Sequence, residues 1–201
     1  MNNAATPSPL RRRIVDVEGL ALPVLEGGPA LSEEAVVFVH GNPGAGNDWE
    51  HLAGETAAFT RVLAPDMPGF GQASKPANFN YTVEGYAACL DALLKTCGIR
   101  RAHLVLHDFG GPWGLAWAAM NPDRLLSVVL INTGLMRGYR WHYMARIWRT
   151  PLLGELSQAI MTRSGFRLAM KHGNPRGLPD AFVDRMYRDL DAGTKRAILK
   201  L

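Results

Sequence analysis

The chain has 201 residues, of which 47% are hydrophobic and 20% are charged, a balance typical of a globular protein with a real core. No run reaches the roughly 18 apolar residues of a membrane span, and the arginines at 11–13 precede acidic residues instead of the apolar segment of an export signal. We expect a cytoplasmic protein with a disordered tail over residues 1–12. Cys89 and Cys97 lie in one helical pattern, too far apart to bridge, and are expected to be buried, reduced thiols.

The predicted elements of the first two thirds alternate between strands and helices. Continuous apolar runs mark the strands, and amphipathic segments with capping residues mark the helices. They comprise a hairpin over 14–25, strands over 35–40, 61–64, 103–108 and 127–132, and helices over 47–58, 82–97 and 111–120. This alternation favours the α/β class, with a mostly parallel sheet covered on both faces.

The character of the chain changes after residue 135. Residues 1–135 carry 9 Lys and Arg against 13 Asp and Glu, whereas residues 136–201 carry 13 against 5. The later segment has no strand-like run, and its Arg, Trp, Met and Tyr residues recur at helical spacing. We therefore expect a core over 13–135 and a helical cap over 136–201.

Two loops that follow predicted strands carry polar side chains where parallel sheets bind ligands, at the carboxyl ends of the strands. They are residues 40–43, His-Gly-Asn-Pro, and residues 107–110, His-Asp-Phe-Gly. An apolar strand that delivers one acidic residue into a glycine-rich turn before a helix has the form of a nucleophile elbow, with Asp108 in the exposed position. The plainer alternative is that Asp108 only caps the helix that follows.

These loops, together with residues 64–71 (Ala-Pro-Asp-Met-Pro-Gly-Phe-Gly), resemble the motifs of the α/β-hydrolase fold. The resemblance is to the branch with an aspartate nucleophile, the haloalkane dehalogenases and epoxide hydrolases, and it covers about residues 14–135. It implies the α/β-hydrolase fold, a mostly parallel doubly wound sheet with a helical cap.

The resemblance also implies a chemistry and roles for individual residues. Asp108 would attack an electrophilic carbon of a small apolar haloalkane or epoxide, forming an alkyl-enzyme ester that a His-activated water hydrolyses. Backbone N–H groups of Asn42 and Phe109 would hold the oxyanion of the second step. His40 would position its loop.

One departure from the family pattern bears on the substrate. Haloalkane dehalogenases carry a Trp after the nucleophile, whose indole N–H holds the departing halide, and Phe109 has no such donor. Asn42, the other halide-stabilising residue of one dehalogenase group, is present, and Trp141 or Trp148 of the cap could supply the missing donor. Epoxide hydrolases use two cap tyrosines instead, for which the candidates are Tyr139, Tyr143 and Tyr187.

The second departure concerns the base. That dehalogenase group places its acid where this chain has Asn132, so the layout resembles the epoxide hydrolases, with the acid one strand later. None of the six histidines, at 40, 51, 103, 107, 142 and 172, matches the family's base. We expect a C-terminally truncated hydrolase that lacks the last strands, leaves the 127–132 strand with an unpaired edge, and is inactive in ester hydrolysis. The alternative is a non-catalytic α/β-hydrolase-like binding protein.

Other ligand classes find little support in the sequence. There is no phosphate loop and no Cys/His spacing for zinc, so we expect neither a cofactor nor a metal. Residues 137–149 are basic with interleaved aromatics, which would suit nucleic acid or anionic lipid. However, Trp141, Met144 and Trp148 fall on one helical face, as in a cap helix that lines a pocket, and a solvated basic face is favoured. The expected partner is a small apolar substrate, with no nucleic acid and no membrane.

Overall fold

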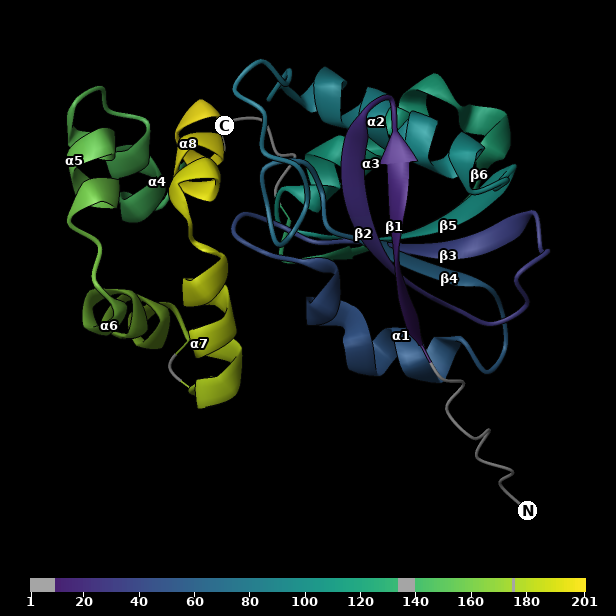
Figure 1. Cartoon of the computed structure of the whole chain (residues 1–201), viewed down its shortest axis with the longest axis horizontal. Coiled ribbons are helices and arrows are strands. Elements are labelled where there is room, and N and C mark those ends of the chain that lie inside the picture. The colour runs from purple at the N-terminus through teal and green to yellow at the C-terminus, as the bar shows by residue number, and fades with distance from the viewer. Residues whose placement is uncertain (1–9, 134–139, 175) are drawn as a thin grey trace.

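The computed structural model describes residues 10–133, 140–174 and 176–201. A sheet with helices on both faces forms one part of the molecule, and a group of helices, α4–α8, lies beside it (Figure 1). The strands are β1 Arg11–Val17, β2 Leu20–Gly27, β3 Glu34–Val39, β4 Val62–Pro65, β5 Arg101–His107 and β6 Leu125–Ile131. The helices are η1 Gly46–Trp49, α1 Glu50–Thr56, α2 Val83–Thr96, α3 Gly110–Met120, η2 Pro122–Arg124, α4 Tyr143–Trp148, α5 Leu153–Ala159, α6 Arg163–Gly173, α7 Asp180–Asp189 and α8 Ala192–Lys200.

The six strands form one sheet in the order β1-β2-β4-β3-β5-β6. The four strands from β4 to β6 are parallel, and β2 runs antiparallel to both of its neighbours, β4 and β1, so the predicted mostly parallel α/β sheet is confirmed. The predicted tail over 1–12 is corrected at its end, because Arg11 and Arg12 belong to β1. They pair with Glu26 and Leu25 of β2. Residues 1–9 lie outside the described residues.

Helices cover both faces of the sheet, as the absence of apolar–polar alternation in the central strands predicts. On one face α2 and α3 bury large aromatic side chains, and the rings of Tyr86 and Trp113 stack with their centroids 4.0 Å apart. On the other face η1 and α1 pack Trp49 and Ala53 against Phe38 of β3. Between the two cores, β3 and β5 pair in parallel, so their carboxyl ends lie side by side.

The predicted helix boundaries agree with the structure at α2 and differ at the first helix. Thr82 caps α2 by accepting the Gly85 N–H at 3.2 Å, and Gly98 follows the helix with φ +70°. The helical segment expected from Asn47 begins instead at Gly46 in η1, because the Asp48 carboxylate accepts the Ala45 N–H at 3.0 Å. It ends at Thr56, two residues before the expected end.

Three expectations from the sequence concern the two thiols, the edge of the sheet and membrane spans. Cys89 and Cys97 are free and buried, as predicted. β6 is the last strand of the sheet, and its Val129 and Leu130 are 50% and 53% exposed. Within the described residues, no helix combines the length and apolarity needed to cross a membrane.

Candidate active site

The turn between β5 and α3 holds Asp108 in a backbone conformation that L-residues rarely adopt. Its φ is +50°, one residue after β5 ends and two before α3 begins. Two donors fix its carbonyl oxygen: the Gly111 N–H at 3.0 Å and the Thr133 hydroxyl at 2.7 Å. Backbone strain of this kind costs about 1–3 kcal/mol, persists only where surrounding contacts impose it, and is concentrated at functional sites.

Two glycines allow the backbone to close around this turn. A Cβ on Gly41 would lie 2.4 Å from the Cβ of Asp108, and one on Gly110 would lie 2.4 Å from the carbonyl oxygen of Val39. Real Cβ atoms essentially never show contacts under 3.0 Å. The first loop and the elbow are therefore in direct contact, and this contact requires Gly41.

The Asp108 carboxylate points to the first loop and makes no cap for α3. Its Oδ1 accepts the backbone N–H of Asn42 at 2.8 Å. The N-cap position of α3 is Phe109, and no side chain caps the helix. The hydrogen bond to Asn42 places one of the two N–H groups expected for an oxyanion site next to the predicted nucleophile.

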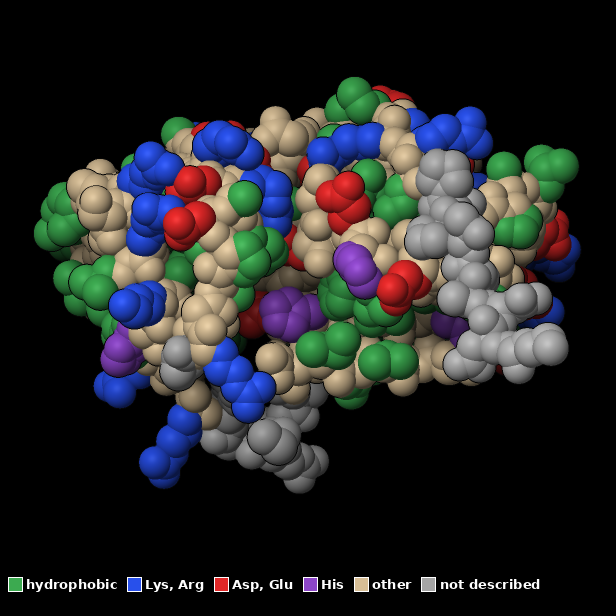
Figure 2. All heavy atoms as spheres, turned by 90° about the horizontal axis from the view of Figure 1, so that it is seen from below, with side chains coloured by type: hydrophobic (Ala, Val, Ile, Leu, Met, Phe, Trp, Pro, Cys, Tyr) green, Lys and Arg blue, Asp and Glu red, His purple; other side chains and the backbone are tan. Residues whose placement is uncertain are grey.

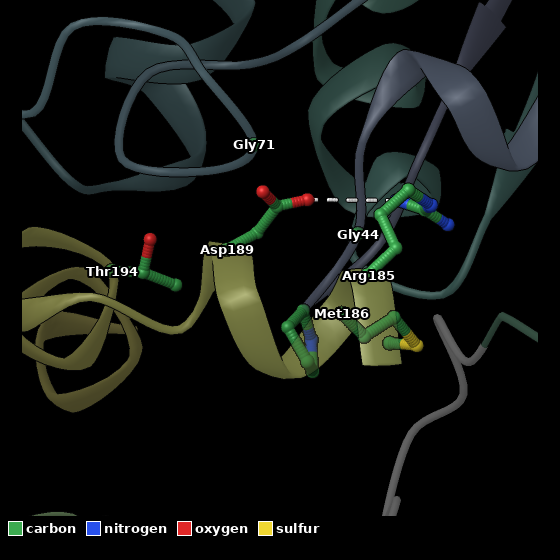
Figure 3. A pocket seen from close by; sticks show the side chains of 7 residues that line it. Gly44, Gly71, Arg185, Met186, Asp189 and Thr194 are labelled. Atoms are coloured by element: carbon green, nitrogen blue, oxygen red, sulfur yellow. Dashed lines mark ion pairs between the residues drawn. The ribbon is translucent and has the colours of Figure 1, made fainter. Parts of the chain in front are cut away.

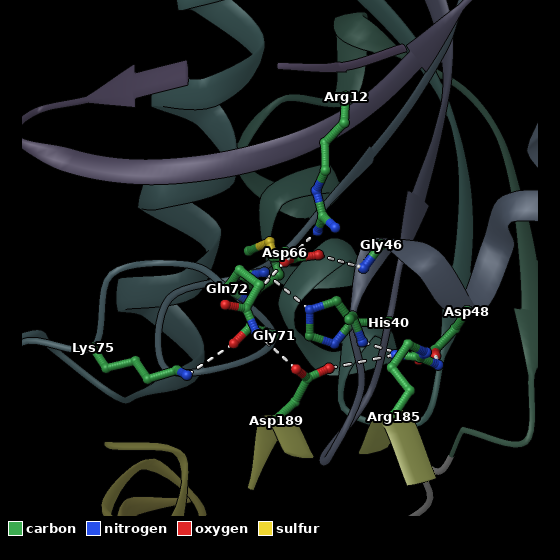
Figure 4. A network of polar contacts seen from close by, with 12 residues as sticks. Arg12, His40, Gly46, Asp48, Asp66, Gly71, Gln72, Lys75, Arg185 and Asp189 are labelled. Atoms are coloured by element: carbon green, nitrogen blue, oxygen red, sulfur yellow. Dashed lines mark hydrogen bonds and ion pairs between the residues drawn. The ribbon is translucent and has the colours of Figure 1, made fainter. Parts of the chain in front are cut away.

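His40 joins the first loop to the loop after β4 (Figure 4). The ring is fully buried, its Nδ1–H donates to the Gly41 carbonyl at 2.8 Å, and its Nε2 accepts the Met67 N–H at 2.9 Å. Both contacts are satisfied by the neutral Nδ1–H tautomer. Burial lowers the pKa of His40 below its ordinary value of 6.5, so the ring stays neutral and keeps both hydrogen bonds.

Asp66 performs a similar task from the third motif, a role that the sequence analysis did not assign. This carboxylate is fully buried and accepts the N–H groups of Gly46 and Gln72 at 2.7 and 2.8 Å. The guanidinium of Arg12 lies 2.7 Å away and neutralises it. The Pro-Asp pair in the third motif was the only sequence signal, since its partners lie up to 54 residues away.

Asp108 lines two cavities between the sheet and the cap, which comprises the helices α4–α8. The larger cavity has a volume of about 440 Å³. Its lining is mostly apolar, with two carboxylates, one imidazole and no Lys or Arg among the described residues: Asn42, Pro43, Asp48, Trp49, His107, Asp108, Ile131, Met170, Asn174, Leu178, Phe182 and Met186. Such a mostly apolar lining with few polar groups is typical of small-molecule sites.

The smaller cavity, of about 40 Å³, lies between the elbow and α4. Trp141 stacks on Phe109 with the ring centroids 6.0 Å apart, and the Arg149 guanidinium lies 4.8 Å from the Trp141 centroid. Trp148 also lines this cavity, and its buried Nε1–H has no partner among the described residues. The buried Oδ1 of Asn42 also lacks a partner.

The two tyrosine candidates that the structure describes, Tyr143 and Tyr187, line neither cavity. Tyr143 is 53% exposed and packs edge-on against His172, which corrects the expectation that it lines the pocket. Because α4 turns Ala145 and Trp148 inward, Tyr143 points outward. Tyr187 packs against Phe166, and Tyr139 lies outside the described residues.

No cluster of three or more His, Cys, Asp or Glu side chains that could hold a metal ion occurs in the described residues. Around Asp108 the described residues supply a second carboxylate, an imidazole, the Asn42 N–H and mostly apolar walls. A carboxylate exposed to an apolar cavity is one of the groups that can act as a nucleophile in covalent catalysis.

Known proteins resemble the chain in sequence and in structure. A haloalkane dehalogenase of Agrobacterium fabrum is 39% identical over 114 residues, which cover 57% of this chain and 36% of that protein. A cis-3-alkyl-4-alkyloxetan-2-one decarboxylase of Xanthomonas campestris is 33% identical over 151 residues, 68% of this chain and 49% of that protein. The chain thus matches less than half the length of each.

Among solved structures, the Cfl2 protein of Burkholderia cenocepacia matches 98% of this chain and 71% of its own, with a TM-score of 0.84 and 27% identity. The haloalkane dehalogenase DatA of Agrobacterium tumefaciens matches with a TM-score of 0.77 and 27% identity, over 98% of this chain and 69% of its own. The model of the alpha/beta hydrolase fold matches residues 34–188. The chain therefore belongs to the alpha/beta hydrolase fold family.

Proposed function

We propose that Asp108 is the nucleophile of a hydrolase site that acts on a small apolar haloalkane or epoxide. An Asp108 oxygen attacks the electrophilic carbon and forms an ester, and the bond from that carbon to the halogen or epoxide oxygen breaks with its electron pair on the leaving atom. One observation carries the proposal: the strained turn at Asp108 exposes a carboxylate that touches the Asn42 N–H and lines both cavities. The similarity to the named dehalogenases supports it.

The cavity walls favour a neutral substrate over an anionic one. Asp48 and Asp108 both line the larger cavity, and no cation lines it in the part of the chain that the structure describes. Asp48 is ion-paired with Arg185, which does not line the cavity, so an anionic substrate would meet the Asp108 carboxylate with no cation in the described lining to offset the repulsion. Apolar side chains of the cap, such as Phe182 and Met186, instead suit an alkyl chain.

The cap donor favours a carbon–halogen bond over an epoxide. The Trp148 indole lines the smaller cavity beside the elbow, and its Nε1–H has no partner among the described residues, so we assign it as the candidate donor to a departing halide. Because Tyr143 and Tyr187 line neither cavity, no tyrosine of the described residues is in place to donate to an epoxide oxygen. Dehalogenation is therefore the first choice within the proposal.

Turnover of the ester needs a base that activates water. His107 and His142 are the imidazoles that line the two cavities, and neither is hydrogen-bonded to Asp108 among the described contacts. His142 caps α4 instead, accepting the Ala145 N–H at 3.3 Å. We expect the ester on Asp108 to persist in this chain, because neither imidazole is hydrogen-bonded to Asp108 among the described residues.

Intact mass spectrometry tests the proposal directly. The chain is incubated with a panel of 1-bromoalkanes, 1-chloroalkanes and terminal epoxides, with the Asp108→Asn variant as the control. We expect one stoichiometric adduct with at least one bromoalkane, and none with the variant. A folded wild-type chain that forms no adduct with any compound, but binds them reversibly, would instead support a non-catalytic binding protein.

A further inference from the structure

Arg185 of α7 lies beside Gly44 of the first loop (Figure 3) and connects the cap to that loop through Asp48 (Figure 4). Its guanidinium forms an ion pair with Asp48 and lies 3.7 Å from Asp189 Oδ2, and it also lies 5.0 Å from the ring centroid of Phe182. The side chains of Arg185 and Asp48 are each only 19% exposed. This ion pair is therefore shielded from solvent and is less screened by salt than a pair on an open surface.

Asp48 in turn fixes the end of the first loop, where η1 begins, and Figure 4 shows this carboxylate next to Arg185. One carboxylate oxygen is paired with Arg185, and the other accepts the Ala45 N–H at 3.0 Å. Three residues before Ala45, the Asn42 N–H donates to Asp108. A short series of contacts thus runs from the cap helix through Asp48 and Ala45 to the N–H group beside the nucleophile.

A second set of contacts ties the same end of the cap to the loop after β4. Asp189 accepts the side-chain N–H of Gln72 at 2.7 Å, and Lys75 pairs with Asp191 at 2.6 Å. Between the two sets only a gap of about 10 Å³ remains, lined by Gly44, Gly71, Thr194 and their neighbours (Figure 3). The cap is thus closed onto both loops, and among the hydrogen bonds and ion pairs of the described residues the Arg185–Asp48 pair is the one that joins the cap to residues 42–48.

We propose that Arg185 is a positioning residue that holds the loop of residues 42–48 against Asp108 whenever the cap is closed. The inference rests on the proposed function of Asp108 for its chemical consequence. Without the guanidinium, the Asp48 carboxylate is left in a mostly buried position without its cation. Because an unpaired buried carboxylate is unfavourable, it moves towards water in the cavity that it lines. The Ala45 contact then loosens, and the Asn42 N–H is no longer held at the reacting carboxylate.

The test compares Arg185→Met, Arg185→Lys and Asp48→Asn with wild type and with Arg188→Met, the matched control. Arg188 lies on the same helix and is exposed, so its loss removes a charge without touching the loop. Hydrogen–deuterium exchange is measured on the peptide spanning 41–48. The rate of alkylation by 1-bromobutane is measured over a concentration series, which separates the limiting rate from the half-saturating concentration.

We expect Arg185→Met to lower the limiting rate about tenfold, since small displacements of reacting groups cost this much or more. Exchange in 41–48 should accelerate, Arg185→Lys should restore part of both effects, and Arg188→Met should match wild type. Asp48→Asn should behave as Arg185→Met does. A role in cap stability alone would shift the urea midpoint and leave the limiting rate unchanged.

Three results would overturn the proposal: wild-type exchange in 41–48 in the folded Arg185→Met variant, equal acceleration in the Arg188→Met control, or an unchanged limiting rate in an Arg185→Met variant of an alkylated chain. If wild type is not alkylated at all, the proposed function of Asp108 fails. The exchange data alone then decide whether Arg185 holds the loop.

Discussion

Replacing Gly41 by Ala tests the contact between the first loop and the nucleophile. The new Cβ would lie 2.4 Å from the Asp108 Cβ and 2.5 Å from its Oδ1, whereas ordinary van der Waals contact begins at 3.4 Å. The 1.0 Å difference must be absorbed by the loop or by the Asp108 side chain. Overpacking of this kind costs about 1–3 kcal/mol of stability. A displacement of about 1 Å at reacting atoms costs about 100-fold in rate.

Urea unfolding and the rate of adduct formation with 1-bromobutane measure the two effects. The control is Gly173→Ala, because its added Cβ has no described atom within 4 Å beyond its chain neighbours and its own helix backbone, and its φ lies outside the left-handed region. Gly41→Ala should unfold at lower urea and form the adduct about 100-fold more slowly, while the control keeps the wild-type rate. A folded Gly41→Ala chain that forms the adduct at the wild-type rate would refute the reasoning.

Three further predictions concern the surroundings of the site. Thr133→Val removes the hydroxyl that donates to the Asp108 carbonyl at 2.7 Å and should cost about 1 kcal/mol in urea unfolding; an unchanged midpoint would contradict the role of this bond. The pKa of buried His40 lies below 6.5, so as pH falls through 6.5 the unfolded chain binds a proton at this residue that the folded chain does not. The urea midpoint should therefore drop between pH 7.5 and 5.5 in wild type, and drop less in His40→Gln. Burial raises the pKa of the Cys89 thiol to about 12, so a thiol reagent at pH 8 should modify Cys89 only after denaturation, and rapid modification of the native chain would count against the buried position.

Local patterns were sufficient to predict the sheet and the order of strand, sharp turn and helix around Asp108. The apolar run before Asp108 and the glycines after it predict a strand, a sharp turn and a helix, and the structure has β5, a residue with φ +50° and α3 in that order. The cap of α2 at Thr82 is likewise a local feature. These elements depend on neighbours within a few residues, so their signals are present in the sequence itself.

Features built from distant residues could not be predicted in this way. Arg185 and Asp48 are 137 positions apart, and nothing in either local sequence indicates their pairing. The outward direction of Tyr143 depends on where the short helix α4 begins, which is set by its His142 cap. Arg12 falls within the predicted tail, because nothing near it in the sequence indicates its ion pair with the buried Asp66. That residue follows β4 and lies 54 positions away.

The position of the adduct on the chain is the measurement that tests the role of Asp108 most directly. After incubation with 1-bromobutane, the chain is digested and the modified peptide is sequenced by tandem mass spectrometry, with a parallel sample treated with alkali. We predict a butyl group on Asp108 that alkali removes, as expected for an ester. An alkali-stable butyl group on another side chain, such as His107 or Met186, with Asp108 unmodified, would contradict the assignment of Asp108 as nucleophile.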